Sequence, residues 1–197
     1  MTYTLRDYQK NAVDASIYGL TQYKKPFIIQ AATGAGKSLI IAEICHRLDV
    51  PILILQPSKE ILEQNYAKLL SYDPLIDAGI YSASKNKKEV AKFTFATIGS
   101  IYKKPELFQH FKYVIIDECH GVDPKNISGM LISFLKAIGT TSVCGLTATP
   151  YRIVQKYYTD EWGGLWYTAH LKMINRIQSA FFKKIMFKIE TPELIKQ

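Results

Sequence analysis

A glycine-rich run in the first quarter of the chain has the residue types that hold a phosphate group. It lies between two apolar runs, residues 27–31 and 39–44, and consists of Ala32, Thr33, Gly34, Ala35, Gly36, Lys37 and Ser38. Glycines let successive backbone N–H groups turn toward one anion, and the start of a following helix adds partial positive charge. Lys37 supplies a point charge for the outer phosphates, and the Ser38 hydroxyl supplies a ligand for Mg²⁺. The run therefore predicts a site for a nucleoside triphosphate with Mg²⁺.

Two adjacent carboxylates, Asp117 and Glu118, follow another apolar run, residues 113–116. In a triphosphate site the first carboxylate would hold Mg²⁺. The second would orient and deprotonate a water molecule that attacks the γ-phosphate. The alternative is an exposed acidic turn after a core strand. Together with the glycine run, the pair predicts Lys37, Asp117 and Glu118 as catalytic residues.

The elements that must position these residues are indicated by hydrophobic spacing. Helices are predicted over residues 5–20, 37–48, 58–70 and 128–138. Short apolar runs predict strands over residues 26–31, 52–55, 79–81, 93–97, 113–116 and 143–146. Continuous apolar strands that alternate with helices indicate an α/β fold whose mostly parallel sheet is flanked by helices. Because ligands bind beyond the carboxyl ends of such strands, we expect the glycine run, Asp117-Glu118 and residues 147–149 at one edge.

Composition narrows the class of protein. The chain has 197 residues, 48% of them hydrophobic, which suits one globular domain or a domain with an appendage. No apolar stretch reaches the roughly 20 residues that span a bilayer, and no apolar leader opens the chain. We therefore expect no membrane partner and a cytoplasmic protein. Cys45, Cys119 and Cys144 lack metal-ligand spacing and are expected as buried thiols in a reducing compartment.

The chain carries a formal net charge of +8, part of which is clustered. Residues 85–104 contain one acidic residue, Glu89, and six lysines: Lys85, Lys87, Lys88, Lys92, Lys103 and Lys104. A basic surface suits a polyanionic partner such as nucleic acid. The alternative is a set of ordinary solvated lysines.

The ordered motifs resemble the first RecA-like domain of superfamily 2 DEAD/DEAH-type (DExH) helicases and translocases, in particular bacterial and phage DNA-repair helicases and restriction-enzyme ATPase subunits. The resemblance covers residues 5–152. The matching segments, in chain order, are residues 5–9, 32–38, 55–62, 97–101, 117–120 and 145–152. The implied fold is a RecA-like P-loop NTPase domain, and the implied cofactors are ATP and Mg²⁺.

The resemblance also implies roles for individual residues. Gln9 would contact the edge of the adenine base, and Arg6 would be a neighbouring contact. The alternative for Gln9 is a glutamine on the surface of a helix. Thr33 to Ser38 would bind the phosphates, and Ser38 with Asp117 the metal ion. The predicted contacts to a nucleic-acid backbone, DNA in preference to RNA, are Ser58, Lys59, Thr97 and Ser100. Ser58 also suits a helix N-cap. The residues expected to couple nucleotide state to nucleic-acid binding are His120, Thr147 and Thr149. A purely structural role is the alternative for His120.

Residues 151–197 have a different character from residues 1–150. Aromatic residues are dense there, and residues 171–188 fit an amphipathic helix, so we expect a short helical and aromatic extension or the start of an interdomain region. Trp162 and Trp166 would pack in a core or between domains, or stack on bases. A family motor also needs a second RecA-like domain, in cis or in trans, that supplies arginines. Two functions stay open at this point: the motor half of a DNA helicase with weak activity alone, or a single-domain ATP-binding regulatory module.

Overall fold

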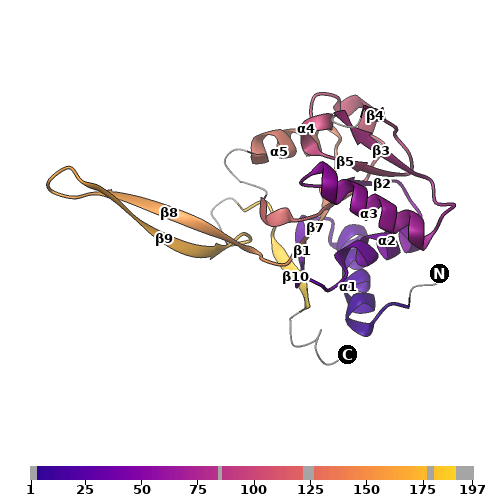
Figure 1. Ribbon diagram of the computed structural model, residues 1–197, viewed down its shortest axis with the longest axis horizontal. Helices are drawn as coiled ribbons and strands as arrows, with labels where there is room; N and C mark the ends of the chain where they lie inside the picture. The colour runs from indigo at the N-terminus through magenta and orange to yellow at the C-terminus, as the bar shows by residue number, and fades with distance from the viewer. Residues whose placement is uncertain (1–3, 84–85, 122–126, 177–179, 190–197) are drawn as a thin grey trace.

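The central element is one twisted sheet with the strand order β10-β1-β7-β6-β2-β5-β3-β4 (Figure 1). The computed structural model describes residues 4–83, 86–121, 127–176 and 180–189. Neighbouring strands run parallel, except that β4 pairs antiparallel with β3. The strands are β1 Phe27–Ala31, β2 Ile52–Leu55, β3 Ala78–Ser82, β4 Lys87–Lys88, β5 Phe93–Ala96, β6 Tyr113–Ile116, β7 Ser142–Thr147 and β10 Lys184–Ile189.

Helices cover both faces of the sheet, so the strands bury side chains on both sides. One face packs against α1 Asp7–Tyr18, α2 Lys37–Leu48 and α3 Lys59–Tyr72. The other packs against α4 Ile98–Ile101, the 3₁₀ turn η3 Pro105–Phe108 and α5 Ile127–Ala137. Successive side chains of β1 point to opposite faces of the sheet and so belong to different cores. Phe27 and Ile29 lie in the core on the side of α1 and α2, whereas Ile28 lies in the core on the other side. Two-sided burial explains why these strands read as unbroken apolar runs.

The predicted mostly parallel α/β fold is confirmed, and so are the helices and strands expected before residue 150. α2 and β2 begin and end at the predicted residues. Several short elements were not expected. They are β4, α4, η3, a π-helical turn, η1 Gly19–Tyr23, that extends α1, and a 3₁₀ turn, η4 Cys119–Gly121, that follows Asp117-Glu118. Lys85 of the lysine cluster lies outside the described residues.

The predicted helix over residues 171–188 is wrong. In its place the chain forms β9 Leu165–Met173, which pairs antiparallel with β8 Tyr151–Thr159, and later β10, which pairs parallel with β1. Residues 177–179 of that predicted helix lie outside the described part. The apolar residues Ile185 and Phe187 are half-buried in β10, where pairing along β1 satisfies the backbone that a helix would have satisfied internally. The tail therefore supplies an edge strand to the central sheet.

Cys45, Cys119 and Cys144 are buried free thiols, as predicted. Burial raises the pKa of Cys144 to about 12, so this thiol stays protonated and unreactive near neutral pH. Among the described residues, no helix combines the length and the apolar character that a membrane crossing requires.

Candidate nucleotide-hydrolysis site

The glycine-rich run forms a loop between the end of β1 and the start of α2. Gly34 and Gly36 adopt φ values of 84° and 78°, in the left-handed region that glycine enters without strain. Gly36 is also the N-cap of α2, so the loop presents the N-terminus of that helix. A Cβ atom at Gly36 would lie 2.6 Å from Nε2 of Gln9. The backbone conformation therefore favours glycine at position 36, and a Cβ atom there would also displace the Gln9 side chain.

Gln9 braces this loop from α1. Its Nε2 donates a hydrogen bond to the carbonyl oxygen of Ala35 (3.0 Å), and its Oε1 accepts one from the backbone N–H of Arg6 (2.9 Å). Gln9 is buried, which rules out the surface-glutamine interpretation, whereas Arg6 and Thr33 are exposed. Gln9 thus links the start of α1 to the glycine-rich loop. Its contact with adenine stays a prediction.

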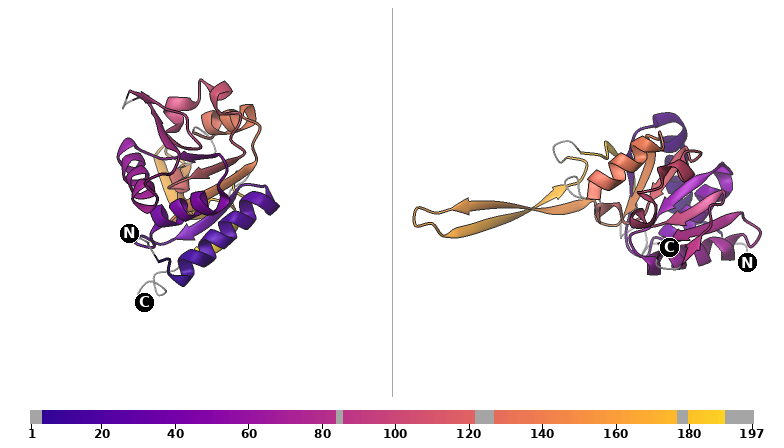
Figure 2. Two further views of the ribbon diagram at one scale, coloured as in Figure 1. Left: turned by 90° about the vertical axis from the view of Figure 1, so that its right-hand side faces the viewer. Right: turned by 90° about the horizontal axis from the view of Figure 1, so that it is seen from above.

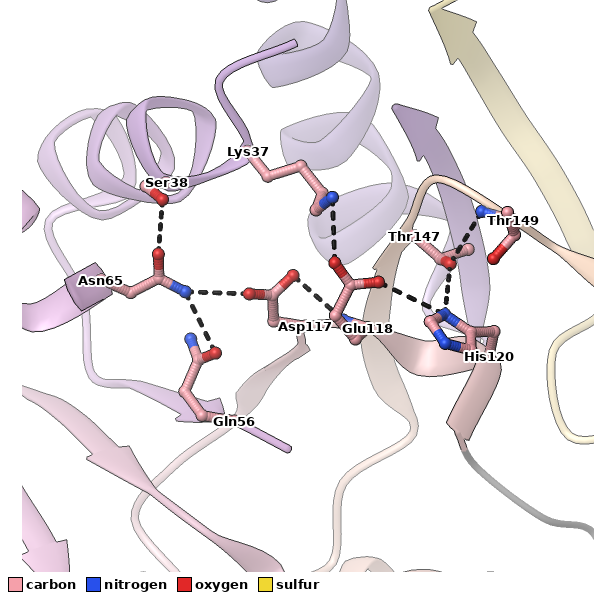
Figure 3. Close-up of polar contacts among 9 residues, drawn as sticks. All are labelled: Lys37, Ser38, Gln56, Asn65, Asp117, Glu118, His120, Thr147 and Thr149. Carbon is pink, nitrogen blue, oxygen red and sulfur yellow. Dashed lines mark hydrogen bonds and ion pairs between the residues drawn. The ribbon is translucent and has the colours of Figure 1, made fainter. Parts of the chain in front are cut away.

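Lys37 and Glu118 meet in the centre of the site (Figure 3). Nζ of Lys37 lies 3.0 Å from Oε1 of Glu118, and the two side chains are 16% and 26% exposed. Glu118 has a φ of +48°, unusual for a residue with a Cβ atom, at the turn that follows β6. The cation predicted for the phosphates is therefore paired with the predicted general base.

A second polar chain joins the two predicted metal ligands through Asn65 of α3. The Ser38 hydroxyl donates to Oδ1 of Asn65, and Nδ2 of Asn65 donates to Oδ2 of Asp117 (2.8 Å) and to Oε1 of Gln56 (3.0 Å). Figure 3 shows Asn65 between the side chains of Ser38 and Asp117. One amide group thereby fixes the relative placement of Ser38 and Asp117.

Sequence reasoning missed both amide side chains, Asn65 and Gln56. Each left a signal. Gln56 is the first polar residue after β2, as Asp117 is after β6, and Asn65 lies among the inward-facing positions of α3 with Leu62 and Leu69. Both are buried, and a buried amide requires partners.

The carboxyl group of Asp117 has a raised pKa. Burial is the main cause, and the nearby charge of Glu118 raises the pKa further. Hydrogen bonds from Asn65 and from the backbone N–H of Glu118, and the charge of Lys37, act in the opposite direction without reversing the shift. A cation beside this carboxylate would offset the cost of its burial, which is the electrostatic setting that favours metal binding.

The donor set fits Mg²⁺ held together with a nucleotide. Ser38 and Asp117 offer hard oxygen ligands, which Mg²⁺ prefers. Within the described ranges, no three His, Cys, Asp or Glu side chains are grouped so as to hold a metal ion by themselves. The remaining ligands would therefore be phosphate oxygens and water, which is the usual arrangement for this ion.

A pocket of about 550 Å³ adjoins the acidic pair. Asp117 and Glu118 form part of its wall, together with Ser58 and Lys59 at the start of α3 and Thr97 before α4. Ser58 is the predicted N-cap, because its Oγ accepts from the backbone N–H of Ile61 (3.3 Å). The structure thus brings three of the four predicted nucleic-acid residues beside the acidic pair.

Ser100, the fourth predicted nucleic-acid residue, is held by local contacts. Its hydroxyl accepts from the backbone N–H of Ala83 (3.1 Å) and shares a hydrogen bond with the Thr97 hydroxyl (2.9 Å). Ser100 is absent from the wall of the pocket among the residues that the structure describes there. Its hydroxyl therefore orients Thr97 in this structure.

His120 connects the acidic pair to the end of β7. Its Nδ1 lies 2.8 Å from Oγ1 of Thr147 and 3.3 Å from Oε2 of Glu118. Oγ1 of Thr147 also accepts from the backbone N–H of Thr149 (3.1 Å). Thr147 is fully buried and Thr149 is exposed, so this chain of contacts runs from the site to the surface. The hydrogen-bonded link expected at His120 is present, and its coupling role stays a prediction.

Known proteins resemble this chain in fold and in sequence. The structure of the UvsW helicase from bacteriophage T4 matches 95% of this chain and 61% of its own, with a TM-score of 0.66 and 22% identity. The type ISP restriction-modification enzyme LlaBIII, bound to DNA, matches 99% of this chain and 16% of its own, with a TM-score of 0.67 and 16% identity. These likenesses confirm the RecA-like fold.

Two curated viral relatives are similar in sequence. The protein named helicase 109L of Invertebrate iridescent virus 3 is 26% identical over 157 residues, which are 76% of this chain and 46% of the relative. The protein named ATP-dependent RNA helicase QP509L of African swine fever virus is 30% identical over 155 residues, 75% of this chain and 30% of the relative. The chain thus spans less than half the length of these relatives. A family model described as "Type III restriction enzyme, res subunit" matches residues 2–152, and this chain therefore belongs to the ResIII family, whose RecA-like domain carries the DExH motifs of superfamily 2 helicases.

Proposed function

We propose that this chain is the ATP-binding motor domain of a nucleic-acid-dependent ATPase, a DNA helicase or translocase that uses Mg·ATP. The observation that carries the proposal is the contact between the phosphate loop and the acidic pair, from Lys37 to Glu118 and from Ser38 through Asn65 to Asp117. Residues far apart in the sequence meet here, and their side chains are of the types that phosphoanhydride hydrolysis requires.

Each side chain has a task that follows from its chemistry. Lys37 would leave Glu118 to meet the outer phosphates, and Glu118, once released, would orient and deprotonate the attacking water. Ser38 and Asp117 would hold Mg²⁺, which neutralises charge on the transferred phosphoryl group. The pairing of Lys37 with Glu118 therefore keeps cation and base together until a triphosphate separates them.

Nucleic acid is the proposed track, with DNA favoured over RNA. Ser58, Lys59 and Thr97 would bind phosphates along the pocket beside the site, and such contacts hold a strand without reading its sequence. The named relatives include an RNA helicase, and LlaBIII was solved with DNA, so the choice of nucleic acid is part of the test.

A second RecA-like domain, in cis or in trans, is the proposed source of arginines for the transferring phosphoryl group. Such arginines are worth roughly 10³–10⁵ in rate in related enzymes. Residues 1–150 would form the ATP-binding domain and residues 151–197 its extension, from which β10 returns to the central sheet. We expect weak hydrolysis by this chain alone.

The cytoplasmic location stays a prediction.

Binding of a fluorescent ATP analogue tests the nucleotide site. Wild-type protein should bind in the presence of Mg²⁺, and Lys37→Ala should bind more weakly because the charge that meets the outer phosphates is gone. Lys136→Ala, an exposed lysine in the last turn of α5, is the matched control and should bind as the wild type does. Equal affinities in all three proteins would contradict the role of the loop.

Titration with labelled DNA and RNA oligonucleotides at several salt concentrations tests the track. A motor domain should bind DNA with an affinity that falls as salt rises, because phosphate contacts release counterions. ATP binding without nucleic-acid binding at low salt would favour the regulatory module instead.

A further inference from the structure

The hairpin formed by β8 and β9 stands apart from the rest of the molecule. Its two strands form a separate two-stranded sheet and project from the carboxyl end of β7 (Figures 1 and 2). A two-stranded ribbon without a packed face is marginally stable in water. The large apolar side chains of the hairpin do not contribute to the core of the domain, so their presence there needs another explanation.

The pairing register places most of these side chains on one face, whereas the exposed Tyr158 lies on the other. Tyr157 lies opposite Tyr167, and Ile153 lies opposite Leu171. Because side chains alternate along a strand, all four share a face, which we call the aromatic face and which includes Tyr151 and Leu165. Their exposed fractions lie between 42% and 73%. The ring centroids of Tyr157 and Tyr167 are 5.9 Å apart.

The turn presents one more aromatic ring. Trp162 is 94% exposed, so its expected packing role in a core is wrong for this structure. The Asp160 carboxylate accepts hydrogen bonds from the backbone N–H groups of Trp162 (3.0 Å) and Gly164 (2.6 Å). Asp160 is therefore engaged in shaping the turn that holds Trp162 at the tip.

Cationic residues occupy the alternate register positions. Arg152 pairs with Lys172, and Lys156 pairs with Thr168, whereas neither strand contains an Asp or Glu residue. Like-charged residues at one register destabilise a strand pair unless an anion lies near them. The Lys172 side chain is exposed on the ribbon, and a long cationic side chain of this kind can extend along an apolar surface while its charge stays in water.

From this combination we propose that the β8–β9 hairpin binds single-stranded nucleic acid. Bases would stack on Tyr157, Tyr167 and Trp162, and phosphates would meet the cationic residues along the strands. The hairpin combines exposed aromatic rings with cationic residues, and its β-strands contain no acidic residue. Single-stranded nucleic acid offers the complementary groups, which are the faces of its bases and its phosphates. The hairpin leaves the sheet two residues beyond Thr149, at the edge where the ATP site lies. This binding site goes beyond the proposed ATP site and is tested separately from it.

Intrinsic fluorescence gives a readout confined to the hairpin. The chain has two tryptophans, Trp162 and Trp166, and both belong to this hairpin. Titration of the full chain with an unlabelled oligo-dT of about 16 nucleotides, the upper site size of a comparable stacking platform, should quench this emission saturably. The apparent affinity should fall as salt rises. Oligo-rU in a parallel titration distinguishes RNA from DNA as the source of the strand.

Variants test the stacking directly by anisotropy of a labelled oligo-dT. Each of Trp162→Ala, Tyr157→Ala and Tyr167→Ala should weaken binding about 5- to 150-fold, the loss of one stacked base. Tyr157→Phe keeps a ring and should retain affinity. Tyr18→Ala removes an exposed tyrosine of α1 and should change nothing. None of these side chains belongs to either core of the domain, so the melting temperature of the domain should stay at the wild-type value.

Several outcomes would overturn the inference. One is binding of oligo-dT without tryptophan quenching and with equal affinity in the hairpin variants, because the strand would then lie elsewhere. Another is self-association of the wild type that Tyr157→Ala abolishes while oligo-dT binding is unchanged, since the aromatic face would then be a protein contact. Nucleotide-analogue binding, measured on the same proteins, shows separately whether the ATP-site proposal fails.

Discussion

Replacing Glu118 with glutamine should raise the affinity for ATP while abolishing hydrolysis. In the structure Lys37 is paired with Glu118 across 3.0 Å, so ATP must break an ion pair before Lys37 can meet its phosphates. The glutamine side chain would be neutral and would leave Lys37 free. The substitution would also remove a negative charge from beside the triphosphate. The variant therefore separates binding from chemistry.

The size of the effect follows from the geometry. Two unit charges 3.0 Å apart attract by about 5 kcal/mol at an effective dielectric constant of 20. Side chains that are 16% and 26% exposed are still hydrated in part, and the desolvation cost cancels most of this attraction. A net value of about 1 kcal/mol remains, which corresponds to a dissociation constant for ATP about fivefold lower in Glu118→Gln.

The assay is a titration with a fluorescent ATP analogue in the presence of Mg²⁺, followed by a measurement of phosphate release. Glu106→Gln, an exposed glutamate of η3, is the control for loss of one negative charge and should match the wild type in both measurements. An unchanged or higher dissociation constant in Glu118→Gln would refute the argument that the ion pair opposes binding. Phosphate release equal to that of the wild type would refute Glu118 as the base.

Three further predictions concern the supports of the site. Asn65→Ala removes hydrogen bonds to buried groups and should lower the free energy of unfolding by about 1–3 kcal/mol in urea titrations, and weaken Mg·ATP binding. Gly36→Ala places an alanine in a left-handed conformation and in contact with Gln9. It should lower the free energy of unfolding by about 1–2 kcal/mol or more and abolish ATP binding. In the control Gly129→Ala, in α5, the added methyl group meets open space, so that variant should be neutral or stabilising. Because the pKa of Asp117 is raised on folding, the folded state holds its proton more tightly, so this group's contribution to stability falls as pH rises above 3.8. The melting temperature of Asp117→Asn relative to that of the wild type should therefore rise between pH 3 and pH 7, by about 2–4 °C for each kcal/mol relieved. A relative melting temperature that falls over this range would contradict the sign.

The sequence was sufficient for the sheet and the outline of the site because both leave local signals. A parallel strand buried on two faces must be apolar throughout, so residues 52–55 and 113–116 are recognisable without a structure. A loop with the conformation of Gly34 and Gly36 requires glycine, so it too is visible in the sequence. Local requirements of this kind act on neighbouring residues and can be read in order along the chain.

The tail and the amide side chains were not predictable in this way. Residues 171–188 contain apolar residues at spacings that fit a helix, and only pairing with β1 decides that residues 184–189 form a strand. Asn65 reads as a polar residue of a helix until α3 packs on the sheet and brings it to Gln56 and Asp117, which follow β2 and β6. In both cases the partner is distant in the sequence, so the signal lies in the pair and not in either segment.

By itself, the sequence determined that this chain has a glycine-rich loop, an acidic pair and a parallel sheet to hold them, because steric and solvation requirements act residue by residue. Only the tertiary structure decided which atoms meet: Lys37 with Glu118, Asn65 between Ser38 and Asp117, and β10 beside β1. It also decided that Tyr157, Trp162 and Tyr167 lie exposed on a projecting hairpin. Contacts of this kind depend on the packing of whole elements, which sets distances that no local pattern specifies.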